Sequence, residues 1–271
     1  MICLIDTAGN VSVLCVVGVA WGVTQLHDVV YMVCGYSIIM RFNATTHQRL
    51  TDINVKDLSV PIDIVACERT SQLYVCDWKA ECVWRVSSDG TDIEHWLPKS
   101  PDDTFIPYTL SVTSTRLLVT SRDTRQLRQF DADGDELRRV QLPDHMEPLH
   151  AVESPTGTFI VGLNNTQLKQ RQVVEVNTGG EVLRQFSGSR LTSLFTHHVA
   201  VDSHGNIFVP DEDNRHILLL DKHLSLRRVI IDEHQLNYKP PLRLCYREDK
   251  GQLLVAFWDI KAVSVFEVLR H

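Results

Sequence analysis

The residues of this chain that could do chemistry stand at the start of repeated apolar segments. His150 and His198 each come directly before such a segment, and His197 lies beside the second of them. Imidazole is a common zinc ligand, but a catalytic zinc normally takes three protein ligands and keeps one open position. Because only two histidines are well placed, the sequence predicts no metal site, no cofactor and no catalytic residues.

The corresponding position in other segments holds Thr109 and Arg243, with Asp63 nearby. We expect this set to line a central channel filled with water: Asp63, Thr109, His150, His198 and Arg243. The sequence has no glycine-rich phosphate loop, no GxSxG turn and no HExxH helix, so the usual signatures of catalysis are missing. These observations favour a protein that is not an enzyme.

The elements that must position these residues form a sixfold repeat. The clearest unit, HHVAVDSHGNIFVPDEDNRHILLLDKHLSLRRVI, covers 197–230 and predicts four short strands at 198–201, 207–209, 216–220 and 226–230, separated by polar turns. A valine in the second strand recurs at intervals of 42 to 48 residues, as Val33, Val75, Val119, Val161, Val209 and Val255. A repeat of this length built from four strands predicts an all-β fold, a six-bladed β-propeller of four-stranded antiparallel blades.

The six units fill the chain as a single domain. We expect the blades at approximately 18–57, 58–101, 102–144, 145–189, 190–235 and 236–271. The last unit has only three strands, ending at 263–269, while 1–17 contains a β-rich run at 11–17 with no blade of its own. We predict that this first segment supplies the outer strand of the last blade and so closes the ring, which protects the sheet edges.

The composition is that of an ordinary globular protein: 271 residues, 44% hydrophobic, 23% charged, with a formal net charge of −7. The most apolar run, 11–23, is too short to span a bilayer and no basic segment precedes it, so we expect no membrane anchor. Seven cysteines without paired CxxC spacing favour free thiols and a cytoplasmic protein. Secretion stays open if a signal peptide lies upstream, and Cys76 and Cys82 are expected to face each other in a way that could allow a disulfide.

The segment VDSHGNIFVPDEDNRHILLLD resembles the NHL repeat, with Asp211, Asn214 and Arg215 close to the expected places and Asp77 in the second unit. In tripartite-motif ubiquitin ligases an NHL propeller forms the C-terminal domain, where it binds RNA or protein. A related six-bladed propeller forms the zinc-dependent lyase that completes peptide amidation. The resemblance implies these activities as candidates. Ligase activity would have to come from sequence outside this chain, because no RING, B-box or coiled-coil segment is present.

The loops between second and third strands should share one face of the ring. The candidate partner-binding residues are the aromatic and basic side chains of these loops: Tyr36, Trp78, Lys79, Arg122, Arg125, Lys169, Arg171, Arg215, Trp258 and Lys261. Tryptophan, tyrosine and arginine are the commonest interface hot spots, whereas a net charge of −7 repels nucleic acid at long range. The sequence therefore predicts a non-enzymatic module that recognises a protein or peptide, with RNA second and a secreted zinc enzyme third, and it indicates neither a membrane partner nor a small-molecule substrate.

Overall fold

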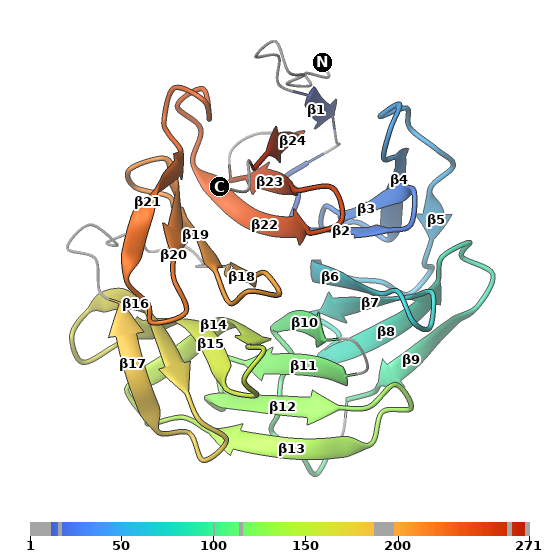
Figure 1. Ribbon diagram of the computed structural model, residues 1–271. Helices are drawn as coiled ribbons and strands as arrows, with labels where there is room; N and C mark the ends of the chain where they lie inside the picture. Colours follow the sequence, from blue (N-terminus) through green and yellow to red (C-terminus); the bar gives the residue numbers. More distant parts are fainter. Residues whose placement is uncertain are drawn as a thin grey trace.

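The computed structural model describes residues 12–15, 18–99, 101–113, 116–186, 198–258 and 262–268. These residues form six four-stranded antiparallel sheets, set around a central axis like the blades of a propeller (Figure 1). The predicted all-β, six-bladed fold is therefore confirmed. Within the described ranges, no helix has the length and apolar character needed to cross a membrane.

Each of the first five blades is a meander that runs outward from the axis in sequence order (Figure 1). Blade one is β2 (Gly22–Leu26), β3 (Val29–Val33), β4 (Ile38–Asn43) and β5 (Ile53–Asn54). Blade two is β6 (Pro61–Cys67), β7 (Gln72–Asp77), β8 (Cys82–Ser87) and β9 (Ile93–Leu97). Blade three is β10 (Thr109–Thr113), β11 (Arg116–Ser121), β12 (Gln126–Phe130) and β13 (Glu136–Gln141).

Blade four is β14 (Met146–Glu153), β15 (Phe159–Asn165), β16 (Gln170–Val176) and β17 (Val182–Phe186). Blade five is β18 (Ala200–Val201), β19 (Ile207–Asp211), β20 (His216–Leu220) and β21 (Leu226–Ile231). Blade six contains β22 (Pro241–Arg247), β23 (Gln252–Phe257) and β24 (Ala262–Glu267) from the end of the chain. Its outer strand is β1 (Ser12–Cys15), which pairs antiparallel with β24, from Ser12 opposite Val265 to Cys15 opposite Ala262.

The hydrophobic core lies between neighbouring blades rather than at one centre. The six valines that mark the repeat are fully buried on the second strands: Val33, Val75, Val119, Val161, Val209 and Val255. The cluster between blades one and two, for example, joins Leu26 and Val33 to Ile64 and Val75. Each blade therefore buries both faces, which explains why its strands have long apolar runs instead of a strict alternation.

The expectation that Cys76 and Cys82 face each other across the β7–β8 pair is wrong. In the β7–β8 pair Cys76 lies opposite Val83 and Asp77 lies opposite Cys82, so the two cysteines are one register step apart. Successive side chains of a strand point to opposite faces, and Cys76 and Cys82 accordingly belong to different interblade cores. Both are free thiols, as are Cys34, Cys67 and Cys245.

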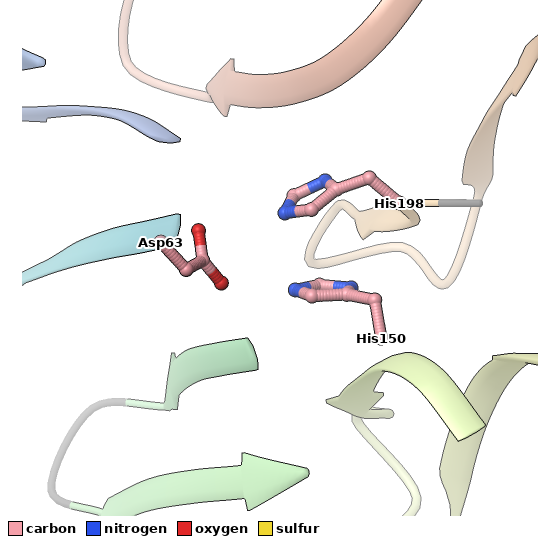
Figure 2. A group of neighbouring side chains, drawn as sticks. All are labelled: Asp63, His150 and His198. Atoms are coloured by element: carbon pink, nitrogen blue, oxygen red, sulfur yellow. The ribbon is translucent and has the colours of Figure 1, made fainter. Parts of the chain in front are cut away.

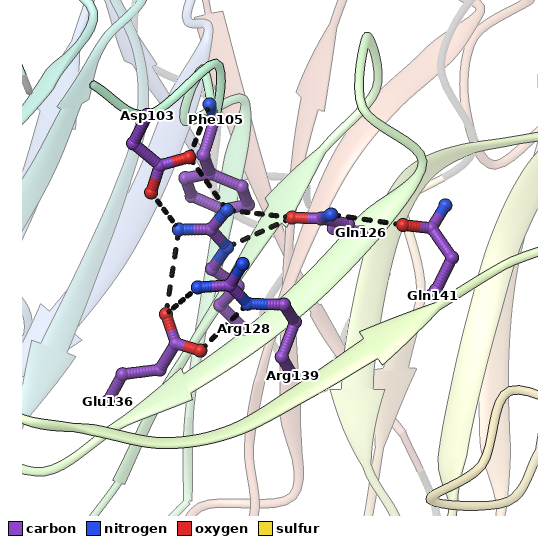
Figure 3. Close-up of polar contacts among 7 residues, drawn as sticks. All are labelled: Asp103, Phe105, Gln126, Arg128, Glu136, Arg139 and Gln141. Atoms are coloured by element: carbon purple, nitrogen blue, oxygen red, sulfur yellow. Dashed lines mark hydrogen bonds and ion pairs between the residues drawn. The ribbon is translucent and has the colours of Figure 1, made fainter. Parts of the chain in front are cut away.

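A buried arginine attaches the segment before blade three to that blade. Arg128 is 4% exposed, and its guanidinium lies 4.1 Å from the ring centre of Phe105. The same guanidinium donates hydrogen bonds to Asp103 and Gln126 and contacts Glu136 (Figure 3). Because the charge is compensated on several sides, this network positions the segment that leads into the inner strand β10.

Candidate functional site

The five residues predicted to line the channel form one layer across the inner strands. Asp63, Thr109, His150 and Arg243 lie on β6, β10, β14 and β22, and His198 lies just before β18. Their exposed fractions run from 0% for Thr109 to 9% for His198. The layer is therefore buried.

A proline two residues earlier accompanies four of these side chains: Pro61, Pro107, Pro148 and Pro241. In blades two, four and six the pairing register shifts between the proline and the layer residue, which marks a β-bulge. Bulges turn a side chain away from its regular direction and are common beside functional sites. The recurring Pro-x-polar triplet is a sequence signal that marks these four positions of the layer.

Each side chain of the layer bonds to the backbone of a neighbouring blade. Asp63 accepts the Leu110 N–H at 2.8 Å, and Thr109 donates to the Leu149 carbonyl at 2.8 Å. His150 accepts the Val199 N–H at 3.3 Å. These bonds connect blades two to three, three to four and four to five, so the layer links successive blades around the axis.

The layer continues through blade six to blade one. His198 accepts the Leu244 N–H at 3.4 Å, and Arg243 donates to the Trp21 carbonyl at 2.7 Å. Trp21 is the sixth member of the layer, which the sequence reasoning missed. The next residue must be a glycine, because a Cβ on Gly22 would lie 2.7 Å from the backbone nitrogen of Ile64.

Three groups of this layer converge: the carboxylate of Asp63 and the imidazoles of His150 and His198. One ligand atom from each lies within 4.8 Å of the other two. Figure 2 shows the Asp63 carboxylate facing both rings, which stack with their centres 3.7 Å apart and their planes at 29°. The sequence analysis grouped His150 with His198 as possible ligands but did not include Asp63, which comes from blade two, in that group. His197, which it placed beside them, lies outside the described residues.

Burial sets the protonation of the three groups. Desolvation raises the pKa of Asp63 to about 6, against the opposing effect of the Arg243 charge. Desolvation lowers the pKa of His150 to about 3 and that of His198 well below its ordinary value, and in both cases Arg243 adds to the effect. At neutral pH the cluster therefore holds a carboxylate and two neutral imidazoles.

Two imidazoles and a carboxylate are a metal-ligand set, but their arrangement does not fit a metal ion. Both nitrogens of His150 are engaged, Nδ1 by the Val199 N–H and Nε2 with the Leu110 carbonyl at 3.1 Å. A histidine binds metal through a lone pair in its ring plane, and the two stacked rings lie in separate planes that differ by only 29°, so their lone pairs do not point to one ion between them. Metal binding by His150 would require at least one of these two backbone hydrogen bonds to break.

A cavity of about 580 Å³ opens beside the cluster, and His150 and His198 form part of its wall. The inner strands of all six blades contribute to it, with apolar side chains such as Val23, Val112 and Val152. Ser111 also lines the cavity, and its Oγ is buried without a hydrogen-bond partner among the described residues. The volume and the mixed lining are typical of a site for a small molecule.

The aromatic candidates of the loop face differ in exposure. Tyr36 is 50% exposed and Trp78 51%, on the neighbouring blades one and two. Trp258 is half-buried, and its ring lies edge-on to that of Trp21 at 5.3 Å. Tyr36 and Trp78 are therefore available to a partner, whereas Trp258 covers the channel layer.

The basic candidates differ in exposure and in their partners. Arg171 is only 6% exposed, and burial lowers its pKa to about 10, while Arg122 pairs with Glu147 at 3.3 Å. Arg125, Lys169 and Arg215 share a left-handed backbone conformation at the end of the turn before the third strand, a position that Glu81 takes in blade two. Lys79 is exposed at the tip of its turn, and Lys261 lies outside the described residues.

Two solved structures share the fold. A streptogramin B lyase gives a TM-score of 0.65 at 11% sequence identity, covering 94% of this chain and 97% of its own. A catalytically inactive histidine-to-alanine variant of virginiamycin B lyase from Staphylococcus aureus, with quinupristin, gives a TM-score of 0.65 at 12% identity, covering 91% and 80%. No family model and no curated protein matches the sequence, so the resemblance to NHL repeats is not shown beyond the propeller architecture.

The prediction that this propeller is not an enzyme is corrected by these comparisons. Both solved structures are lyases, so the architecture gives no ground for excluding catalysis. The sequence argument rejected catalysis because only His150 and His198 were well placed as ligands. In the structure Asp63 joins these two histidines, and a cavity lies beside them.

Proposed function

We propose that the chain is a lyase-type enzyme in which Asp63 and His198 act on the substrate and His150 positions them. The observation that carries the proposal is the convergence of these three groups within 4.8 Å, with His150 and His198 lining the channel cavity. The fold shared with two lyases supports it, as does the inactivity of one of them after a histidine was replaced. No step of the proposed reaction uses a metal ion.

The protonation states suit an elimination next to a carbonyl group. The Asp63 carboxylate, with a pKa of about 6, is the base that takes the proton from carbon. The C–H electron pair becomes the new C=C bond, and the leaving group departs with its own bonding pair. Since His198 Nδ1 accepts the Leu244 N–H, neutral His198 carries its proton on Nε2, and this N–H stabilises the developing oxyanion with a hydrogen bond without transferring the proton.

His150 contributes by holding this arrangement. Its Nε2 bonds to the Leu110 carbonyl while the Leu110 N–H bonds to Asp63, so a single peptide unit orients both side chains. Its ring also stacks on His198 at 3.7 Å. Both of its nitrogens are used in these contacts, which leaves it no free atom for proton transfer.

Turnover of small carbonyl compounds with a leaving group in the β position, quinupristin included, tests the proposal. We expect the rate to fall about tenfold per pH unit below pH 6, because Asp63 must be ionised to act as base. Asp63→Asn should lower the rate by at least about a hundredfold, and His198→Gln by a similar amount, with unchanged circular dichroism.

The control is Asp57→Asn, which changes an exposed carboxylate outside the channel and should leave the rate unchanged. Absence of turnover throughout the series, or full activity of Asp63→Asn, would contradict the proposal.

Peptide recognition on the loop face is a second candidate function, favoured by the exposure of Tyr36 and Trp78 on adjacent blades. For peptides selected from a random library on the intact protein, Trp78→Ala should weaken binding by about 2 kcal/mol, as loss of an aromatic anchor does. Leu226→Ala, a change at an equally exposed side chain on β21, is the control. If the ligand is RNA instead, changing Arg122 and Arg125 should weaken binding more than Trp78→Ala and flatten its salt dependence.

A further inference from the structure

A second cavity, separate from the channel cluster, lies between blades four and five. Its volume is about 230 Å³, smaller than a site for a drug-sized molecule. Three turns form its walls: the turn after β14, the turn after β18 and the turn between β20 and β21. Gly205 lets two of them approach closely, because a Cβ at this position would lie 3.2 Å from the Cβ of Lys222.

The floor of this cavity is apolar. Ile160 is 3% exposed and Ile207 is 1% exposed, and both side chains line the cavity together with Val201. A floor of branched aliphatic side chains accepts the hydrocarbon part of a ligand. The polar groups are confined to the walls and rim.

The rim supplies hydrogen-bond donors in excess of acceptors. Arg184, Lys222, His204 and His223 all line the cavity, and Glu175 is the one carboxylate among the lining residues that the structure describes. Both oxygens of Glu175 are engaged, one by Arg184 and one by the Thr158 hydroxyl at 2.8 Å. His204 Nδ1 lies 3.4 Å from the Ser203 hydroxyl and 3.8 Å from Glu248, so His204 has only its Nε2 to offer a ligand. The ammonium group of Lys222 and the imidazole of His223 complete the polar groups at the rim.

Donors around an apolar floor select a ligand with an acceptor-rich anionic group on a hydrocarbon stem. A carboxylate offers two oxygens, whereas a phosphate monoester offers three strong acceptors, which matches Lys222, His204 and His223. We infer that this cavity is a binding site for a small aryl or alkyl phosphate monoester. The site goes beyond the proposed lyase activity and includes none of the clustered residues Asp63, His150 and His198.

Titration of the intact protein with phenyl phosphate, followed by the ring-proton resonances of the histidines, tests the inference. We expect the signals of His204 and His223 to shift and that of His145, which is not part of this cavity, to stay unchanged. Lys222→Gln should weaken binding about tenfold, since it removes a charge-assisted contact, and Lys250→Gln, at a different cavity, should leave it unchanged.

Three further ligands separate the contributions of the hydrocarbon stem, the anionic charge and the number of acceptor oxygens to binding. Inorganic phosphate should bind about tenfold more weakly than phenyl phosphate because it lacks the stem, and phenol should bind more weakly still because it lacks the anion. Benzoate should also bind more weakly, with its two oxygens. The inference is overturned if Lys222→Gln binds phenyl phosphate like the parent, if His204 and His223 do not respond, or if phosphate or phenol binds as tightly as phenyl phosphate.

Discussion

The polar side chains in the channel show how a buried group can be structural and reactive together. Asp63 accepts two backbone N–H groups, from Ile64 and Leu110, and still has a pKa raised to about 6. Burial outweighs both the hydrogen bonds and the nearby Arg243, which otherwise stabilise the charged form. A carboxylate in this state titrates close to neutrality, which is the property that a catalytic base requires.

The stacked histidines lead to a prediction about metal content. The chain purified without added metal should hold well below one zinc per molecule by elemental analysis, because His150 and His198 do not direct their lone pairs to a common point. Addition of zinc followed by gel filtration should not change this value. One zinc per chain that is lost in His150→Ala would show that the rings rearrange around an ion.

At the scale of the element, the aspartate that gave the resemblance to NHL repeats is a structural residue. Asp77 is fully buried at the end of β7, and its carboxylate accepts N–H groups of Ser59, Val60 and Ala80, the closest at 2.6 Å. It therefore fixes the segment entering blade two to the hairpin of the same blade. Asp211 has the corresponding place in blade five, where it accepts hydrogen bonds from Asn214.

Replacing this carboxylate tests its structural role. Asp77→Ala should lower the free energy of unfolding by about 3 kcal/mol or more, since it leaves three N–H groups without their charged acceptor. Asp57→Ala, at an exposed aspartate before the same blade, should change it by less than about 0.5 kcal/mol. Denaturant unfolding followed by circular dichroism measures both, and equal midpoints for the two variants would contradict the role.

At the scale of the whole molecule, the ring is closed by strands from the two ends of the chain. β1 is the outer strand of blade six, antiparallel to β24, so this blade combines residues that are far apart in sequence. The polar layer adds a second connection, from Arg243 of blade six to Trp21 of blade one. Closure by pairing is what leaves a propeller with only short sheet edges.

Removal of residues 1–17 should therefore expose the edge of β24. We expect this variant to aggregate or to unfold at a clearly lower temperature than the parent, since an unpaired strand edge recruits other chains. Light scattering and thermal denaturation measure the two effects. A truncated chain that stays monomeric and equally stable would show that β1 is not needed for closure.

Much of the fold follows from the sequence alone, because the spacing of the six valines repeats one local pattern of strands and turns. Those valines are fully buried, and the positions of Asp63, His150 and His198 at the inner strands were also predictable. Their convergence was not. It depends on how blades two, four and five face one another across the axis, and on the bulges after Pro61 and Pro148 that redirect two of the side chains. The cavity beside them and the donor-rich cavity between blades four and five likewise arise from contacts between blades, which a pattern within one repeat does not encode.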